Sequence, residues 1–272
     1  MSVLQSYPSI PNEAVDKLEK QVIEAVRIYI SNMCRRSVGE PELEIRLGHL
    51  NGKGKFLSGI SEMAWRRVRD TLNAHTRWKS ITDWREIYDF FYTIEDEVQN
   101  KPIQIRTTRY IDEQGDMQFD HFQKNKVSEC TVNISNVENI ASSARVSFAT
   151  ETPYRGKLPD IASTDCIRIK NRKSYHWVGT TGAEWVIDIS KVWTDKTQTQ
   201  TTRLRDLDEN KIPNTSKDTY ATFEVEIECV NAVKYFKEKG NTNRYIALSC
   251  LMKIIGLLPE HGNRNKPVEI SL

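Results

Sequence analysis

Glutamates occupy every second position in two short segments, one early and one late in the chain. The segments are ELEIR at residues 42–46 and EVEIE at residues 224–228. Alternate residues of a β-strand point to the same side, so each segment predicts a strand with carboxylates on one face and apolar side chains on the other. Clustered carboxylates suit a hard divalent cation such as Mg²⁺ or Mn²⁺, which prefers oxygen ligands. The two segments are therefore candidates for metal binding.

Basic residues alternate in the same way between these two segments. In CIRIKNRKS, the side chains of Arg168, Lys170 and Arg172 share one strand face. Other segments with the same period add four cations, which are Arg106, Lys124, Lys126 and Arg145. Arginine and lysine neutralise phosphate oxygens, and arginine can do so with two parallel hydrogen bonds. If all these charged faces point to one interior, they form a site for a metal-bound polyphosphate.

The alternative explanation of this pattern is structural. One strand with charges on one face is usually a solvated face, and charge ladders across an exposed sheet would also give the pattern. Like charges at alternate positions repel one another unless a metal, an anion or opposite charge lies against them. Because carboxylate rows occur at both ends of the strand series and cation rows lie between them, we favour a shared polar interior. The sequence holds no G-x-x-x-x-G-K-[ST] loop, which excludes a P-loop phosphate site.

A period of two runs from Pro41 to Cys229 and predicts eight strands. They are ELEIRLG, EIYDFFYTI, PIQIRTTRY, MQFDHFQKNKV, ARVSFATE, CIRIKNRKSYHWV, AEWVIDISKVW and ATFEVEIEC. The strands follow one another without regular alternation with helices. This pattern favours an antiparallel sheet that curls or closes, rather than a doubly wound α/β fold. The predicted fold class is mainly β, with a closed antiparallel eight-stranded barrel, a charged interior and flanking helices.

Apolar residues at helical spacing predict a few helices around this series. One helix is predicted at residues 15–29, after a candidate cap at Asn12, and another at residues 61–74. Two short helices are predicted at about residues 230–239 and 242–257. The sequence has no internal repeat and no low-complexity linker, so a single domain is predicted for residues 1–272. Its parts are a helical lead-in at 1–40, the strands at 41–229 and the C-terminal helices at 230–272.

Composition limits the classes of function. The net charge is only +2 although 28% of the 272 residues are charged, so phosphate recognition must be local rather than a general nucleic-acid coat. The five cysteines are scattered and form no CxxC pair, which suits a reducing compartment. No segment has the roughly 18 to 20 apolar residues that span a bilayer, and the N-terminus lacks a signal-peptide pattern. Neither secretion nor a membrane partner is expected.

Five motifs, taken in order, resemble one known family. They are ELEIRLG, RVSFATE, RIKNRKS, WVIDIS and EVEIE, all within residues 41–229. This set resembles the triphosphate tunnel metalloenzymes, and within them the metal-dependent RNA 5′-triphosphatases of mRNA capping in fungi, protozoa and large DNA viruses. The resemblance implies an eight-stranded tunnel that uses Mg²⁺ or Mn²⁺ to remove the γ-phosphate from triphosphate-ended RNA. That reaction is the first step of mRNA capping and leaves a diphosphate end.

The resemblance also implies partners and roles for single residues. The implied partners are triphosphate-ended RNA and an mRNA guanylyltransferase. The implied localisation is the nucleus if the protein is cellular, and the host cytoplasm or the virion if it is viral. The implied metal ligands are Glu42, Glu44 and Glu228. The implied catalytic residues are Glu226 and Asp188, which would act on water, with Glu151 and Glu224 at further acidic positions whose roles stay open. The implied phosphate-binding residues are Arg106, Arg168, Lys170, Arg172 and either Lys124 or Lys126.

The sequence leaves some features open. Val186 departs from the pattern, because several relatives carry a basic residue at that position. Other members of the superfamily act on inorganic tripolyphosphate, thiamine triphosphate or ATP, and the roughly forty residues before the first glutamate motif favour the RNA branch over them. The rival from another class is a non-catalytic module that binds polyphosphate or RNA ends, and the complete set of candidate metal ligands argues against it. The sequence leaves the viral or cellular origin and the oligomeric state open.

Overall fold

The computed structural model describes residues 39–96, 101–112, 114–133, 143–159, 164–179, 182–195 and 221–230, together with single residues nearer the two ends of the chain. Its long strands are β1 (Glu40–Leu50), β4 (Arg85–Asp96), β5 (Lys101–Ile111), β6 (Met117–Asn133), β7 (Ser143–Pro153), β8 (Cys166–Val178), β9 (Glu184–Asp195) and β10 (Thr222–Cys229). The shorter elements are β2 (Phe56–Ser58), β3 (Ser80–Ile81) and the helix α2 (Glu62–Ala74). All eight predicted strands are present.

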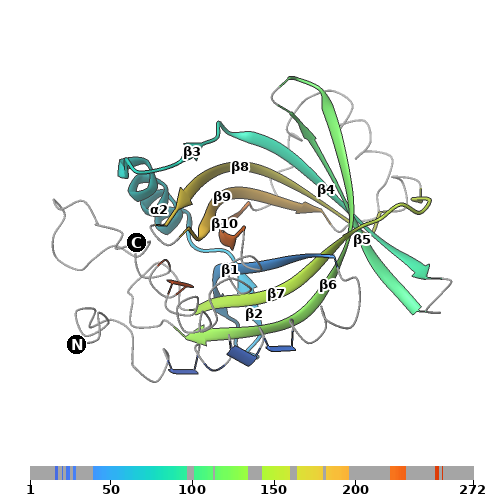
Figure 1. Ribbon diagram of the computed structural model, residues 1–272, viewed down its shortest axis with the longest axis horizontal. Helices are drawn as coiled ribbons and strands as arrows, with labels where there is room; N and C mark the ends of the chain where they lie inside the picture. Colours follow the sequence, from blue (N-terminus) through green and yellow to red (C-terminus); the bar gives the residue numbers. More distant parts are fainter. Residues whose placement is uncertain are drawn as a thin grey trace.

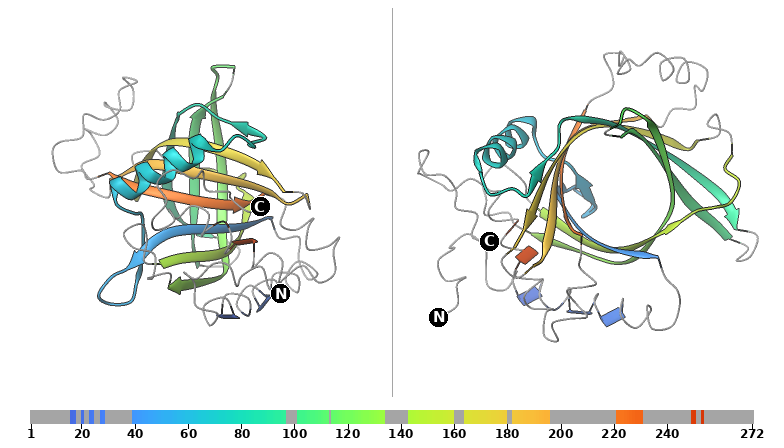
Figure 2. Two further views of the ribbon diagram at one scale, coloured as in Figure 1. Left: turned by 90° about the vertical axis from the view of Figure 1, so that its left-hand side faces the viewer. Right: turned by 45° about the horizontal axis from the view of Figure 1, so that its top comes forward.

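The long strands close into an antiparallel barrel. They pair in the order β10-β9-β8-β4-β5-β6-β7-β1, and β1 also pairs with β10 (Figures 1 and 2). Two meanders, β4 to β7 and β8 to β10, meet where β4 pairs with β8. The first strand forms the seam between the other ends of the two meanders, because β1 pairs with β7 on one side and with β10 on the other. The predicted fold class is confirmed.

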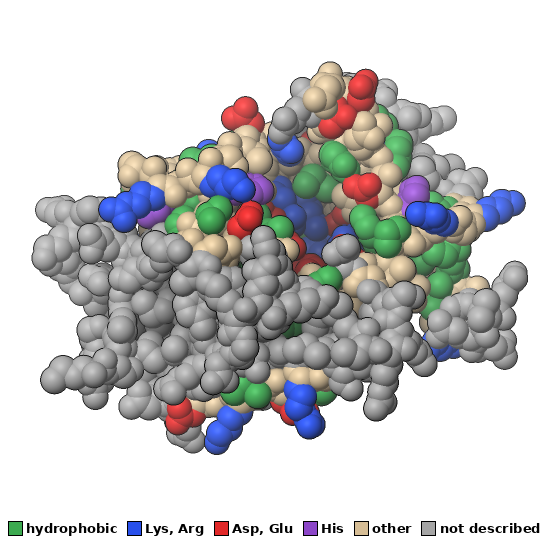
Figure 3. Space-filling view, viewed as in Figure 1, with side chains coloured by type: hydrophobic (Ala, Val, Ile, Leu, Met, Phe, Trp, Pro, Cys, Tyr) green, Lys and Arg blue, Asp and Glu red, His purple; other side chains and the backbone are tan. Residues whose placement is uncertain are grey.

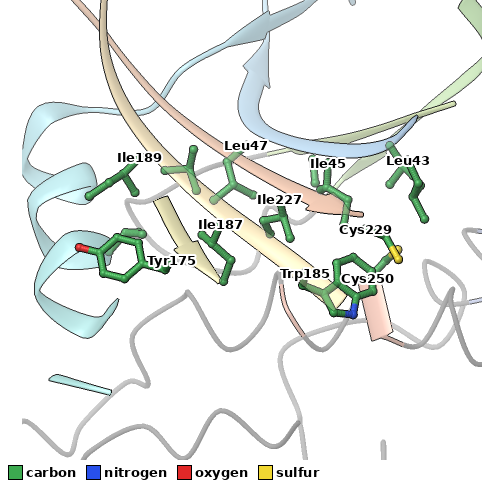
Figure 4. Close-up of a cluster of buried hydrophobic side chains, with 14 of the residues drawn as sticks. Leu43, Ile45, Leu47, Tyr175, Trp185, Ile187, Ile189, Ile227, Cys229 and Cys250 are labelled. Carbon is green, nitrogen blue, oxygen red and sulfur yellow. The ribbon is translucent and has the colours of Figure 1, made fainter. Parts of the chain in front are cut away.

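The apolar face of the strands points out of the barrel. Leu43 and Ile45 of β1 and Val225 and Ile227 of β10 have at most 1% of their surface exposed. They belong to a core cluster that includes the buried face of α2 (Figure 4). Burial of each such side chain stabilises the fold by about 1.5–3 kcal/mol. Ordinary small barrels fill their interior with apolar side chains, whereas here the outer cover holds the core and leaves the lumen to polar groups.

The helix α2 is delimited by local hydrogen bonds. Ser61 precedes it, and its hydroxyl oxygen accepts a hydrogen bond from the amide of Ala64 at 3.2 Å, as an N-cap does. Val68 and Leu72 lie on the buried face. The indole nitrogen of Trp78 donates to the carbonyl oxygen of Leu72 at 2.8 Å, which satisfies one of the carbonyls left open at the end of a helix. The predicted helix in this segment is confirmed.

The other predicted helices, at residues 15–29, 230–239 and 242–257, lie almost entirely outside the described residues. The described residues of the first and last of these segments, such as Ile23 and Lys253, are helical. Among the described residues, no helix combines the length and apolar character that a bilayer crossing requires.

Candidate active site in the barrel lumen

A cavity of about 220 Å³ lies in the barrel lumen, and charged side chains dominate its lining. The charged lining residues are Glu42, Glu44, Arg46, Asp89, Arg106, Glu151, Lys170, Arg172, Asp188, Glu226 and Glu228. Figure 3 shows Lys and Arg side chains inside a hollow on this side of the molecule. The strands whose alternation predicts a charged face therefore turn that face inward. Nine of the predicted site residues meet in this cavity.

Carboxylates gather where β1 pairs with β10. Glu44 lies directly opposite Glu228 in the strand register. Burial, together with the charges of Glu42 and Asp188, raises the pKa of Glu228 to about 8. Burial also raises the pKa of Glu42 to about 7, although Lys124 offsets part of the effect. Two buried carboxyl groups that resist ionisation mark a place where negative charge is in excess.

Lys124 of β6 reaches several of these carboxylates. Its ammonium nitrogen lies 2.5 Å from Oε2 of Glu42, 3.5 Å from Oε2 of Glu44 and 3.9 Å from Oε1 of Glu151. Burial opposes its charge, but the neighbouring carboxylates, Glu44 and Glu42 foremost, raise the pKa of Lys124 above its ordinary value. Lys124 therefore carries a charge inside the lumen.

Neither lysine is among the residues that line the cavity, and Lys126, unlike Lys124, forms no ion pair with the described lumen carboxylates. Its ammonium nitrogen pairs with Oε1 of Glu129 at 2.6 Å, and 59% of its side chain is exposed. The register of β6 against β7 shifts between Lys126 and Ser128, which is a bulge that the alternation of residue types does not predict. The structure thus separates two lysines that have the same parity in the sequence.

Lys170 is held deep in the lumen by an aspartate. Its ammonium nitrogen lies 2.6 Å from Oδ2 of Asp89, and Oδ1 of Asp89 accepts a hydrogen bond from the hydroxyl of Thr108 at 2.8 Å. Burial and the charge of Arg172 lower the pKa of Lys170, and Asp89 offsets part of this effect. An anion such as a phosphate oxygen in the cavity would further favour the charged lysine.

Arg172 of β8 joins acids of two neighbouring strands. Its Nη1 lies 2.7 Å from Oδ2 of Asp188, and its Nη2 lies 2.6 Å from Oε2 of Glu226. Arg46 pairs with Glu226 at 2.9 Å and also with Glu44. Burial alone would raise the pKa of Glu226, but Arg46 and Arg172 hold it well below its ordinary value. Glu226 is therefore ionised, while Oδ1 of Asp188 is buried without a hydrogen-bond partner among the described residues.

Two further pairs of predicted site residues differ in their position. Arg106 pairs with Glu151 at 2.9 Å, and both line the cavity. Arg168 donates from Nη2 to both carboxylate oxygens of Glu224, at 2.7 and 2.8 Å. Neither Arg168 nor Glu224 is part of the described cavity lining. These two side chains satisfy one another instead of facing the open space.

The lining also contains residues to which the sequence assigned no role. Asp89 is a single acid within the aromatic segment around Tyr88 and Phe90, which face outward and are buried. Its inward direction follows from the period of two, but one acid in an aromatic strand forms no charge row. Arg46 shares a face with the first two glutamates, and its position opposite Glu226 depends on the pairing of β1 with β10.

The donor set suits a hard divalent cation. Glu42, Glu44 and Glu228 supply carboxylate oxygens, and no described lysine or arginine forms an ion pair with Glu228. In the arrangement described, no three acidic, histidine or cysteine side chains converge as a ready-made metal centre. Lys124 and Arg46 instead engage Glu42 and Glu44. A cation here would replace part of that ion pairing and relieve the repulsion around Glu228.

Comparison with known proteins places these observations in a family. Residues 49–254 match the family model described as mRNA capping enzyme, beta chain. This match begins just after the two glutamates of β1. A search of the curated proteins found no match.

Solved structures share the fold. The RNA triphosphatase Pct1 of S. pombe has a TM-score of 0.57 and 17% identity, over 96% of this chain and 98% of that chain. The same enzyme in complex with the Spt5 CTD has a TM-score of 0.58 and 16% identity over the same shares. The capping enzyme triphosphatase of mimivirus has a TM-score of 0.51 and 15% identity, over 88% of this chain and 96% of that chain. Because the family model matches most of the chain and this barrel is also the fold of solved RNA triphosphatases, the chain belongs to the mRNA capping enzyme beta-chain family of RNA triphosphatases.

Proposed function

We propose that the protein removes the γ-phosphate of triphosphate-ended RNA with a divalent cation, Mg²⁺ or Mn²⁺, held by Glu42, Glu44 and Glu228. One observation carries the proposal. The lumen places carboxyl groups with raised pKa values opposite buried cations, so it is complementary to a cation and a polyphosphate together. A solvated sheet face would not bury these charges, and a purely structural charge ladder would not leave Glu228 without a basic partner among the described residues.

The cations of the lumen would bind the phosphates. Lys170 and Arg172 lie deep in the cavity on β8, and Arg106 lines the same cavity from β5, two strands away in the sheet. Each is now paired with an acid, but a guanidinium has five N–H donors in all and an ammonium three, so phosphate oxygens would bind the donors that the acids leave open. A divalent cation, when bound, supplies charge withdrawal from the γ-phosphate. The cationic side chains stabilise the charge that develops on the leaving diphosphate.

Asp188 is the best-placed residue to orient the attacking water. Its Oδ1 is buried and accepts no hydrogen bond from the described residues, while Arg172 fixes the other oxygen. Glu226 is strongly ionised between Arg46 and Arg172, which makes it a weak base but a fixed acceptor for a hydrogen bond from water. Water attacks the γ-phosphorus, and the bond from that phosphorus to the bridging β-phosphate oxygen breaks. The products are a diphosphate RNA end and inorganic phosphate, which keeps the oxygen and one proton of the water, and the other proton is released to solvent.

Phosphate release tests the proposal. Wild-type protein is assayed on triphosphate-ended RNA with Mg²⁺, with Mn²⁺ and with EDTA. Glu42→Ala and Glu228→Ala should abolish release, while Glu129→Ala, which removes an acid outside the described cavity lining, should leave it intact. Circular dichroism checks that all three variants fold. Release that persists in EDTA or in a folded Glu42→Ala variant would overturn the assignment of the cation site.

A second candidate function deserves the same assay. Within the described residues, the apolar members of the cavity lining are only Pro41 and Ile87, and the lining includes no aromatic residue. The cavity itself therefore recognises phosphates rather than bases, which favours some hydrolysis of inorganic tripolyphosphate or nucleoside triphosphates. The ratio of kcat/KM values for RNA, tripolyphosphate and ATP separates these substrates. Binding without turnover of any of them would favour a non-catalytic module.

The product implies the partner. A diphosphate RNA end is the acceptor of an mRNA guanylyltransferase, so we also propose that such an enzyme acts on the product of this protein. In a coupled assay, a guanylyltransferase should label triphosphate-ended RNA only after treatment with the active protein. Labelling that is equal without the protein would refute the coupling.

A further inference from the structure

An aromatic side chain continues the charged lumen face towards the rim of the barrel. In the register of β5 and β6, Phe122 lies directly opposite Arg106. Directly opposed residues of an antiparallel pair share a face, so Phe122 lies on the face that Arg106 contributes to the cavity. The guanidinium carbon of Arg106 is 6.0 Å from the centroid of the Phe122 ring. A phosphate-binding cation and an aromatic ring therefore lie side by side.

The position of Phe122 is unusual for an apolar residue. The side chain is only half-buried, and neither of the two apolar clusters among the described residues includes it. Charged neighbours share its face, with Arg106 directly opposite on β5 and Lys124 two positions along β6. Burial against a core thus does not account for an aromatic ring at this position.

The ring lies where the nucleoside end of a substrate would emerge. Phe122 pairs with Pro153, the last residue of β7, so it stands at the edge of the barrel. Lys170 and Arg172 lie deeper, with the carboxylate group of β1 and β10. A triphosphate whose γ-phosphate is bound among those groups would run past Arg106 towards the rim. In Figure 1 the β5–β6 hairpin projects past its neighbouring strands.

We propose that Phe122 stacks on the base of the first nucleotide of the RNA, and so forms a nucleoside subsite next to the phosphate-binding cavity. The inference rests on the proposed function. Stacking on an aromatic ring accepts every base because each has a π-face. The subsite therefore distinguishes substrates that carry a nucleoside from inorganic tripolyphosphate, and it does not read the identity of the base. This gives an RNA end an advantage that the aromatic-free cavity does not provide.

The test compares substrates with and without a base. The substrates are triphosphate-ended RNA, the same RNA with an abasic first nucleotide, and tripolyphosphate. Phe122→Leu should lower the ratio of kcat/KM for RNA over tripolyphosphate by about tenfold, mainly through KM, because an aliphatic side chain loses the stacking. Phe122→Trp should keep the ratio. The matched control is Phe119→Leu, since Phe119 is on the same strand, points to the other face and is 49% exposed.

The outcomes are distinct. Wild-type protein should lose about tenfold on the abasic RNA, and Phe122→Leu should add no further loss on that substrate. An equal loss on RNA and tripolyphosphate would show that Phe122 only positions Arg106, and full activity on abasic RNA would overturn the subsite. Fluorescence anisotropy of triphosphate-ended RNA gives the same comparison as affinities without turnover. If wild-type protein hydrolyses no substrate, the proposed function fails, and the anisotropy still decides the subsite.

Discussion

The pair of Arg168 and Glu224 offers a test of which lumen charges serve structure and which serve substrate. Nη2 of Arg168 donates to both carboxylate oxygens of Glu224, and the side chains are 17% and 7% exposed. Arg168→Met would leave the Glu224 carboxylate buried without its main partner. Breaking a buried pair from one side costs about 3–5 kcal/mol. For a domain of this size, about 2–4 °C of Tm corresponds to 1 kcal/mol, so Tm should fall by roughly 6–20 °C.

The double variant Arg168→Met with Glu224→Met should recover most of that loss. Replacing both partners of a buried pair by apolar side chains of similar size is often close to neutral, because the cost of desolvating two charges disappears. Thermal unfolding of the wild type, both single variants and the double variant gives the coupling between the two positions. Phosphate release, measured well below the lowest Tm, should remain within about tenfold of wild type in the double variant, since neither residue belongs to the described cavity lining.

Two results would refute this reasoning. A double variant that is as unstable as the sum of the single variants would show that the pair is not coupled. A double variant that is folded and stable yet as inactive as Lys170→Ala would show that Arg168 or Glu224 acts on the substrate after all, as the family resemblance allows.

Three further predictions concern single side chains. Glu228→Gln should raise the stability of the cation-free protein by roughly 1–3 kcal/mol at pH 7, because burial and neighbouring acids raise the pKa of Glu228 to about 8. The gain in stability should grow from about pH 4.5 to 8, and Mg²⁺ should no longer raise the Tm of the variant. A variant that is less stable than wild type in EDTA would contradict the repulsion between Glu228 and its neighbours. Lys124→Ala should reduce phosphate release at least tenfold and Lys126→Ala less than twofold, and the reverse order in kcat/KM would exchange their roles. Lys253 lies 4.0 Å from the Trp177 ring centroid, and burial lowers its pKa to about 8. Wild-type stability should therefore rise between about pH 8 and 10.5. Chemical denaturation of Lys253→Met should show no such rise, and at pH 7 this variant should be more stable than wild type by about 1–3 kcal/mol. A destabilised variant would show that the contacts of Lys253 with aromatic rings outweigh the cost of burying its charge.

Much of the fold follows from the alternation of residue types. Each of the eight strands carries its own period of two, so its existence and its two faces are local properties that the sequence contains. The inward direction of the charges follows as well, because both rows of glutamates need opposite charge close by. The helix α2 was equally local, with its cap at Ser61 and its apolar spacing.

The pairing of distant strands does not follow from the alternation of residue types. That β4 pairs with β8 places Asp89 beside Lys170, and nothing near either residue in the sequence indicates it. The bulge after Lys126 cannot be predicted from the sequence pattern either, because a register shift leaves the alternation of residue types before it unchanged. Arg168 and Glu224 come from two strands that are not neighbours in the sheet. The alternation of residues places both side chains in the lumen, but it does not show that they form an ion pair with each other.

The seam at β1 has a consequence for how the molecule folds. The proposed cation ligands come from the first and the last strand of the barrel, which touch only when both meanders are complete and the ring closes. Pairing of segments so distant in sequence is slow, because the entropy of closing a long loop must be overcome before the contacts form. A cation that binds Glu42, Glu44 and Glu228 would therefore bind late, to a nearly native chain, and would slow unfolding more than it speeds folding. The proposed cation ligands would then also link the first and last strands of the barrel and stabilise its closed form.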